Sequence, residues 1–100
     1  MKLAHPFFVL AREILAVPAG ATEHPGIMPD KVAPLAARIE AHADLIEALL
    51  PKSAANLRAT ADRLCMKCRM VGLSRAETFQ LGRYLAQVGG MVAATEPEDA

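Results

Sequence analysis

Two cysteines are the only residues of this chain whose spacing is typical of metal or redox chemistry. They lie in Cys65-Met66-Lys67-Cys68, and two thiolates at this spacing can share a metal ion or form a redox pair. A structural zinc ion needs four ligands, but the chain has no second Cys-x-x-Cys motif and no histidine pair at ligand spacing. The alternative is that the cysteines are small buried side chains, since Cys68 falls on an apolar helix stripe. A metal site at Cys65 and Cys68 is therefore the third functional hypothesis, and we expect no cofactor.

No other group of residues indicates catalysis. The chain contains no glycine-rich phosphate loop and no Gly-x-Ser-x-Gly nucleophile motif. Paired carboxylates with a histidine at motif spacing are also missing from the sequence. We therefore predict that the protein is not an enzyme.

The composition predicts a single all-α domain. The chain has 100 residues, of which 53% are hydrophobic and only 4% aromatic. It is rich in alanine, which is the best helix former and a poor strand former. A chain of this length forms one domain, and its small side chains leave a modest core that a partner or a second copy would complete.

The centre of the chain predicts an antiparallel pair of helices. In residues 31–50 apolar residues recur at steps of three and four, and a similar stripe follows in residues 54–71. Pro51 is expected to end the first helix, and Ser53 to cap the second. Because the connection is so short, the two helices should form an antiparallel hairpin.

Two further helices should flank this hairpin and complete a small helical bundle. Residues 3–17 form an apolar helix, residues 18–29 a linker rich in proline and glycine, and residues 93–100 a disordered acidic tail. A capping box formed by Ser74 and Glu77 predicts the start of a helix over 75–88. Its small residues at four-residue steps should let another helix approach closely. These residues are Gly82, Ala86 and Gly90.

Positive charge is concentrated between Lys52 and Arg83, although the net charge of the whole chain is zero. This segment has seven basic and two acidic residues. Its basic side chains either pair with the acidic face of the preceding helix or form a surface for phosphates or an acidic protein.

The first functional hypothesis is a bacterial regulator that acts by binding another protein. The apolar helix 3–17, on its proline-rich linker, either packs in its own bundle or enters a partner. Small antiactivators, which bind and inhibit a transcriptional regulator, are the class of protein that we expect. The predicted partner-binding residues are Phe7, Phe8, Leu10 and Ile14, with Met66 and Met70 as a second patch.

The turn before residue 75 also resembles the bacterial helix-turn-helix pattern. The residues that occupy its positions are Cys68, Gly72, Leu73, Ser74, Thr78 and Leu81. This resemblance implies a DNA-binding regulator with its turn at residues 72–74, which is the alternative function. The second helix would then present Arg75, Gln80 and Arg83 to phosphates and base edges.

The sequence also predicts where the protein works and how it assembles. Two cysteines three residues apart are not a disulfide framework, which favours the cytoplasm. Arg12 and Glu13 interrupt the first apolar run, so we expect neither an export signal nor a membrane span. The regular apolar seam in residues 31–50 predicts a homodimer, because it exceeds what an alanine-rich neighbour needs.

Overall fold

Four α-helices make up most of the chain that the structure describes. This computed structural model describes residues 2–68 and 70–96. The helices are α1 (His5–Leu15), α2 (Pro29–Ile46), α3 (Pro51–Arg63) and α4 (Arg75–Thr95), and a π-helical turn, η1 (Leu64–Cys68), continues α3. The predicted all-α fold is therefore confirmed. Within the described ranges, no helix combines the length and the apolar character needed to cross a membrane.

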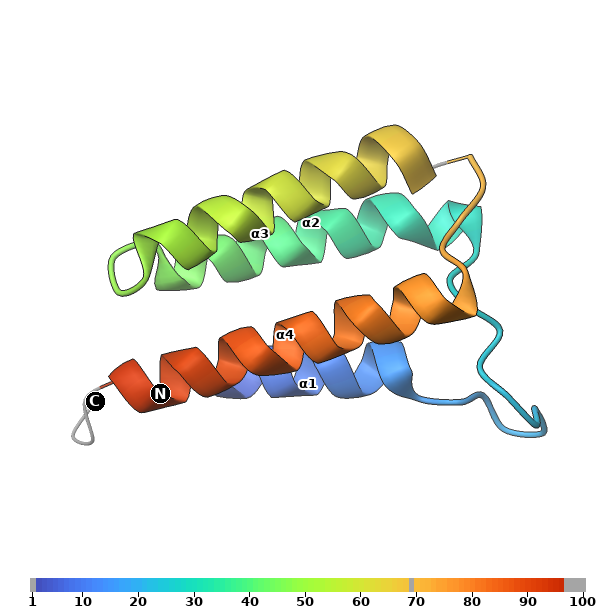
Figure 1. The fold of residues 1–100 in the computed structure, drawn as a ribbon, viewed down its shortest axis with the longest axis horizontal. Helices are drawn as coiled ribbons and strands as arrows, with labels where there is room; N and C mark the ends of the chain where they lie inside the picture. The colour runs from blue at the N-terminus through green and yellow to red at the C-terminus, as the bar shows by residue number, and fades with distance from the viewer. Residues whose placement is uncertain (1, 69, 97–100) are drawn as a thin grey trace.

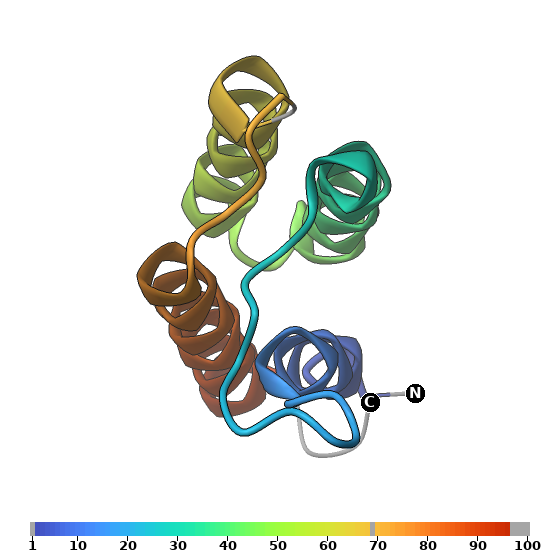
Figure 2. The same cartoon turned by 90° about the vertical axis from the view of Figure 1, so that its right-hand side faces the viewer.

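The helices form two antiparallel pairs. Helix α2 packs on α3, as the sequence predicted for the central hairpin, and α1 packs on α4 (Figure 1). Seen end-on, the four helices occupy the corners of a bundle (Figure 2). The connections from α1 to α2 and from α3 to α4 lie at the same end of the molecule (Figure 1).

The start of α3 differs from the sequence prediction. The helix begins at Pro51, and Ser53 is buried inside it instead of capping it. Proline is well suited to the first position of a helix, because its φ angle is already helical and its missing N–H would have no partner there. Pro29 begins α2 in the same way. Both prolines therefore begin helices, whereas the sequence analysis predicts only that Pro51 ends the preceding helix.

Helix α4 continues beyond the predicted end at residue 88. It reaches Thr95, so two residues in its middle, Gly89 and Gly90, do not break it. Glycine lowers the stability of a helix, and the burial of Val88 and Val92 against the core offsets this loss. Residues 93–95 of the predicted tail are therefore helical, and residues 97–100 lie outside the described residues.

Small residues on α4 allow the close approach of α1. A Cβ atom added to Gly82 would lie 2.5 Å from Leu15, and one added to Gly89 would lie 3.0 Å from the ring of Phe8. Gly90, in contrast, has no neighbouring atom within 4 Å of that position. The predicted small face is confirmed at Gly82, but Gly89 takes the place that we had assigned to Gly90.

The linker between α1 and α2 is fixed to the bundle at two points. His24 is buried, with its Nδ1 accepting a hydrogen bond from the Gly26 N–H (2.9 Å) and its Nε2 lying 2.6 Å from the carbonyl oxygen of Ile14. Ile27 and Leu73 then form an isolated antiparallel bridge between the two loops. No sequence pattern indicates a role for His24, but this residue holds the linker against α1.

The apolar seam of α2 is covered within one copy of the chain. Val32, Ile39 and Ile46 are fully buried. Beside them, the ring of His42 packs edge-on against Phe7 with 5.2 Å between the ring centroids. The homodimer stays a prediction, but this seam no longer provides a reason for it.

Candidate functional site

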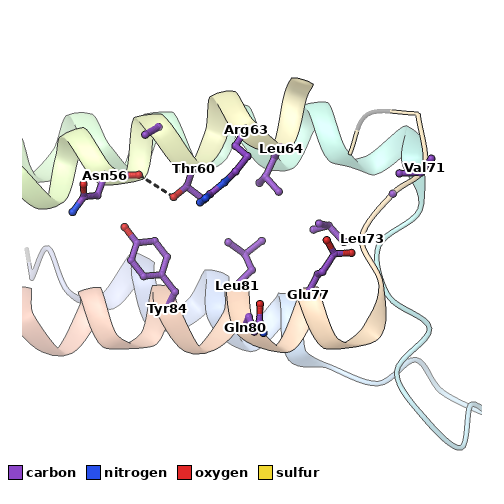
Figure 3. Close-up of a pocket in the computed structure, with 12 residues that line it drawn as sticks. Asn56, Thr60, Arg63, Leu64, Val71, Leu73, Glu77, Gln80, Leu81 and Tyr84 are labelled. Atoms are coloured by element: carbon purple, nitrogen blue, oxygen red, sulfur yellow. Dashed lines mark hydrogen bonds between the residues drawn. The ribbon is translucent and has the colours of Figure 1, made fainter. Parts of the chain in front are cut away.

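A groove with a cavity volume of about 820 Å³ lies between α3 and α4 (Figure 3). Leu64 and Leu81 point toward one another across it, and Tyr84 points from α4 toward α3 (Figure 3). We call this feature the α3/α4 groove. Its lining residues are Asn56, Ala59, Thr60, Arg63, Leu64, Val71, Gly72, Leu73, Glu77, Gln80, Leu81 and Tyr84.

The side chains of α3 explain why the groove is not filled. Asn56, Ala59, Thr60 and Arg63 recur at steps of three, one and three, which places them on one face of the helix. They are short or polar. Leu57 is fully buried and belongs to the core. Because the wall has no large apolar side chain before η1, α3 does not pack tightly against α4 there.

The opposite side of the bundle, between α1 and α2, is held together by specific contacts. Arg38 and Glu13 form an ion pair with 2.6 Å between Nη1 and Oε2. The Nε2 atom of His42 lies 3.2 Å from the carbonyl oxygen of Pro6, next to the ring contact with Phe7. These contacts join the two helix pairs on the side away from the groove.

The loop before α4 closes one end of the groove. Gly72 and Leu73 line this end, and the bridge between Leu73 and Ile27 fixes their backbone. Gly72 has a φ angle of +76°, and a Cβ atom there would collide with the carbonyl oxygen of Ile27. Glycine is therefore needed at this position by both its backbone conformation and the close approach of the two loops.

Tyr84 provides a polar group on the α4 wall. Partial burial raises the pKa of Tyr84 above its ordinary value, while nearby Thr60 and Arg63 act in the opposite direction. The phenol is therefore neutral around pH 7, and it can donate or accept a hydrogen bond. It is the single tyrosine of a chain without tryptophan, so tyrosine absorbance and fluorescence report on this groove alone.

The basic residues between Lys52 and Arg83 divide into two groups. Arg58 forms ion pairs with Asp44 and Glu47. The hydrogen bonds in these pairs raise the pKa of Arg58, and the bond to Asp44 has the larger effect. The predicted pairing with the acidic face of α2 is thus confirmed for Arg58. Arg63 and Arg83 differ, because no ion pair among the described residues includes either of them.

Among the described residues, Glu77 is the one acidic residue that lines the groove. Its carboxylate accepts a hydrogen bond from the Ser74 backbone N–H (2.9 Å), and its own N–H donates to the Ser74 hydroxyl oxygen (3.1 Å). The Ser74 backbone N–H first, and the Ser74 hydroxyl second, donate hydrogen bonds to the carboxylate and so lower the pKa of Glu77. The predicted capping box is confirmed, and it occupies this carboxylate at the start of α4.

The predicted partner-binding residues fall into two different environments. Phe7, Leu10 and Ile14 are buried in the core, so helix α1 packs in its own bundle and does not present them on the surface. Phe8 is 42% exposed. Met66 and Met70 are 85% and 81% exposed, and neighbouring Val71 is 78% exposed and lines the groove.

The residues predicted for DNA contact lie in two different environments on α4. Arg75 pairs with Glu23 at 2.5 Å and lies over the ring of Phe79. Gln80 lines the groove, and both Gln80 and Arg83 line an adjoining hollow. Helices α3 and α4 run in opposite directions (Figure 1), whereas the two helices of a helix-turn-helix cross at a large angle.

The structure adds no support for a metal site at the cysteines. Cys65 is half-buried and packs against the core, while the side chain of Cys68 lies outside what the structure describes. Among the described residues there is no cluster of three or more histidine, cysteine, aspartate or glutamate side chains that could hold a metal ion.

The α3/α4 groove is not predicted by the sequence. Its only signal was the run of short and polar residues that begins at Asn56, which is equally typical of a solvent-exposed helix face. Tyr84 was missed because a lone tyrosine on a helix indicates no site by itself. Comparison with known proteins does not add a functional assignment, because no family model, curated protein or solved structure matches this chain.

Proposed function

We propose that this chain is a non-catalytic regulatory protein that binds another protein in the α3/α4 groove. The observation that carries the proposal is an open groove with apolar side chains at its centre and polar groups along its rims. Binding sites commonly combine apolar contact area with a few polar groups that fix the orientation of the ligand.

The exposed residues beside the groove support a macromolecular partner. Met66, Met70 and Val71 are large apolar side chains that are almost fully exposed within one short segment, and Val71 joins them to the groove. Methionine side chains adapt to different surfaces, and clustered exposed apolar residues are typical of protein-binding sites. A small ligand inside the groove would not need this extended surface.

The sequence-based hypotheses define a more specific form of this proposal. In that form the bound protein is a transcriptional regulator, the chain is its cytoplasmic antiactivator, and binding blocks the surface that the regulator uses. The contact moves from α1 to the groove and the methionines, because Phe7, Leu10 and Ile14 are buried.

Blocking the groove with one side chain tests the proposal. Ala59 is exposed and lines the groove, so Ala59→Trp should fill it without disturbing the core. Ala55 is exposed on the same helix but does not line the groove, so Ala55→Trp is the matched control. In affinity purification from the native host, we expect one partner to be retained by wild type and Ala55→Trp and lost with Ala59→Trp.

Two results would contradict a groove-binding partner. Retention of the same proteins by all three chains would place binding elsewhere, and absence of any specifically retained protein would remove the proposed function. Circular dichroism of each variant must show unchanged helix content, so that loss of binding reports on the groove.

A further inference from the structure

We infer that the partner segment bound in the α3/α4 groove is an acidic amphipathic helix. The inference rests on the proposed protein-binding function and specifies the chemistry of the partner. It follows from the nature of the groove walls, their length and the charge along their rims.

The groove walls favour a helix over an extended peptide. The α3 and α4 walls are helices whose backbone groups are bonded within each helix, so they offer no strand edge to an extended chain. At the closed end, the N–H and C=O groups of Leu73 are already bonded to Ile27. An extended peptide would leave its own N–H and C=O groups without partners as it enters the groove. A helix satisfies these groups internally and presents only side chains, which can pack between those of α3 and α4.

The length of the walls sets the length of the bound segment. Asn56 and Leu64 are eight residues apart, which corresponds to about 12 Å along a helix. This distance accommodates about two helical turns, with apolar anchors at positions i, i+4 and i+7. Contact with Val71 and Met70 beyond the groove would engage roughly one further turn.

The charges on the rims favour acidic residues beside those anchors. Arg63 lies on the α3 wall and Arg83 lines the hollow that adjoins the groove at Tyr84. Neither has an ion-pair partner among the described residues. Glu77, the one acidic residue in the described lining, already accepts the hydrogen bond of the capping box. A segment with carboxylates on both flanks of its apolar stripe therefore complements the rims.

Two libraries of displayed helical peptides test the inference on the full chain. Both vary Leu, Ile, Phe and Met along one apolar stripe over about three turns. One library has Glu at the flanking positions, and the other has Lys at the same positions. We expect selection to enrich the Glu library, and the selected peptides to bind wild type and Ala55→Trp but not Ala59→Trp.

Charge reversal on the protein provides the second measurement. Arg63→Glu and Arg83→Glu should each weaken a selected Glu peptide by roughly tenfold, which corresponds to about 1.4 kcal/mol. Arg12→Glu is the matched control, because Arg12 is exposed on α1 away from the groove and its reversal should leave the affinity unchanged.

Several outcomes would overturn the inference. Equal enrichment of the two libraries, or preference for the Lys library, would contradict the acidic character of the segment. If every selected peptide also binds Ala59→Trp, the peptides do not occupy the groove. If a peptide keeps its full affinity after a proline is placed in its middle, the bound segment is not a helix. The proposed function is judged separately by capture of the native partner. If that capture depends on the groove while the peptides show no charge preference, the acidic helix is wrong and the protein-binding function stands.

Discussion

The backbones of Ile27 and Leu73 exchange two hydrogen bonds across the loops that precede α2 and α4. The Ile27 N–H donates to the Leu73 carbonyl oxygen at 2.9 Å, and the Leu73 N–H donates to the Ile27 carbonyl oxygen at 2.8 Å. Each residue follows a glycine with positive φ, Gly26 at +85° and Gly72 at +76°. This reciprocal pair joins the two helix connections and fixes the end of the α3/α4 groove.

Substitution of either bridge glycine should destabilise the fold strongly. In Gly26→Ala and Gly72→Ala the new Cβ atom would collide with the carbonyl oxygen of the opposite loop, in addition to the strain of positive φ. We expect each to lower the free energy of unfolding by more than about 2 kcal/mol. Gly20→Ala is the control, because Gly20 has φ +86° but open space, and should lose only about 1 kcal/mol. Urea denaturation measures all three, and equal losses would disprove the role of close approach.

Two glycines of α4 should respond to alanine in opposite directions. Gly90→Ala places a methyl group in open space and should stabilise the protein by about 0.5–1 kcal/mol, because alanine is the better helix former. Gly82→Ala places the methyl group against Leu15, and this overpacking should destabilise the protein by about 1–3 kcal/mol. The higher helix propensity of alanine offsets part of this loss. Thermal unfolding compares the two, and stabilisation by both would mean that α1 and α4 do not pack this closely.

The capping box of α4 should make stability depend on pH in the acidic range. The pKa of Glu77 is lowered in the folded state, so its contribution is complete above the unfolded value of about 4.3 and is lost as pH falls through the folded pKa. Glu77→Gln keeps an oxygen that can accept the Ser74 N–H bond but removes the titration. The difference in stability between wild type and Glu77→Gln should therefore shrink as pH falls below about 4. A difference that stays constant with pH would contradict this role of the charge.

Loss of the Ser74 hydroxyl tests the same cap by a second route. Ser74→Ala removes the acceptor of the Glu77 N–H bond and should lower the free energy of unfolding by about 1 kcal/mol at neutral pH. Ser53→Ala provides the contrast, because Ser53 lies inside α3 and caps no helix. Equal losses in denaturant unfolding would mean that the cap contributes nothing specific.

Tyr84 should titrate at higher pH than an exposed tyrosine. Its pKa is raised in the folded state, so the associated stability is complete below the unfolded value of about 10 and is lost as pH rises through the folded pKa. Tyrosinate absorbance follows the titration of this single residue directly. In Tyr84→Phe, the part of the stability loss at alkaline pH that comes from Tyr84 should be absent. A peptide bound in the groove should raise the pKa further by excluding water, and an unchanged titration would place the peptide elsewhere.

The sequence by itself determined the helical fold and the central hairpin. Alanine richness and apolar residues at steps of three and four specify helices locally, and a short connection leaves α2 and α3 no alternative to antiparallel packing. The capping box at Ser74 was also predictable, because its two hydrogen bonds join residues three positions apart. Each of these features depends on neighbours along the chain.

The tertiary structure decided the features that depend on distant residues. Whether α4 ends at Gly89 depends on Phe7 and Phe8, which lie about eighty positions away and cover the glycine. The apolar surface of α1 was predicted to bind a partner, but α4 covers it. An apolar stripe that packs inside its own bundle has the same local sequence pattern as one that binds a partner. The α3/α4 groove likewise exists because the short side chains around Ala59 face α4, and only the packing of the two helix pairs establishes which helix they face.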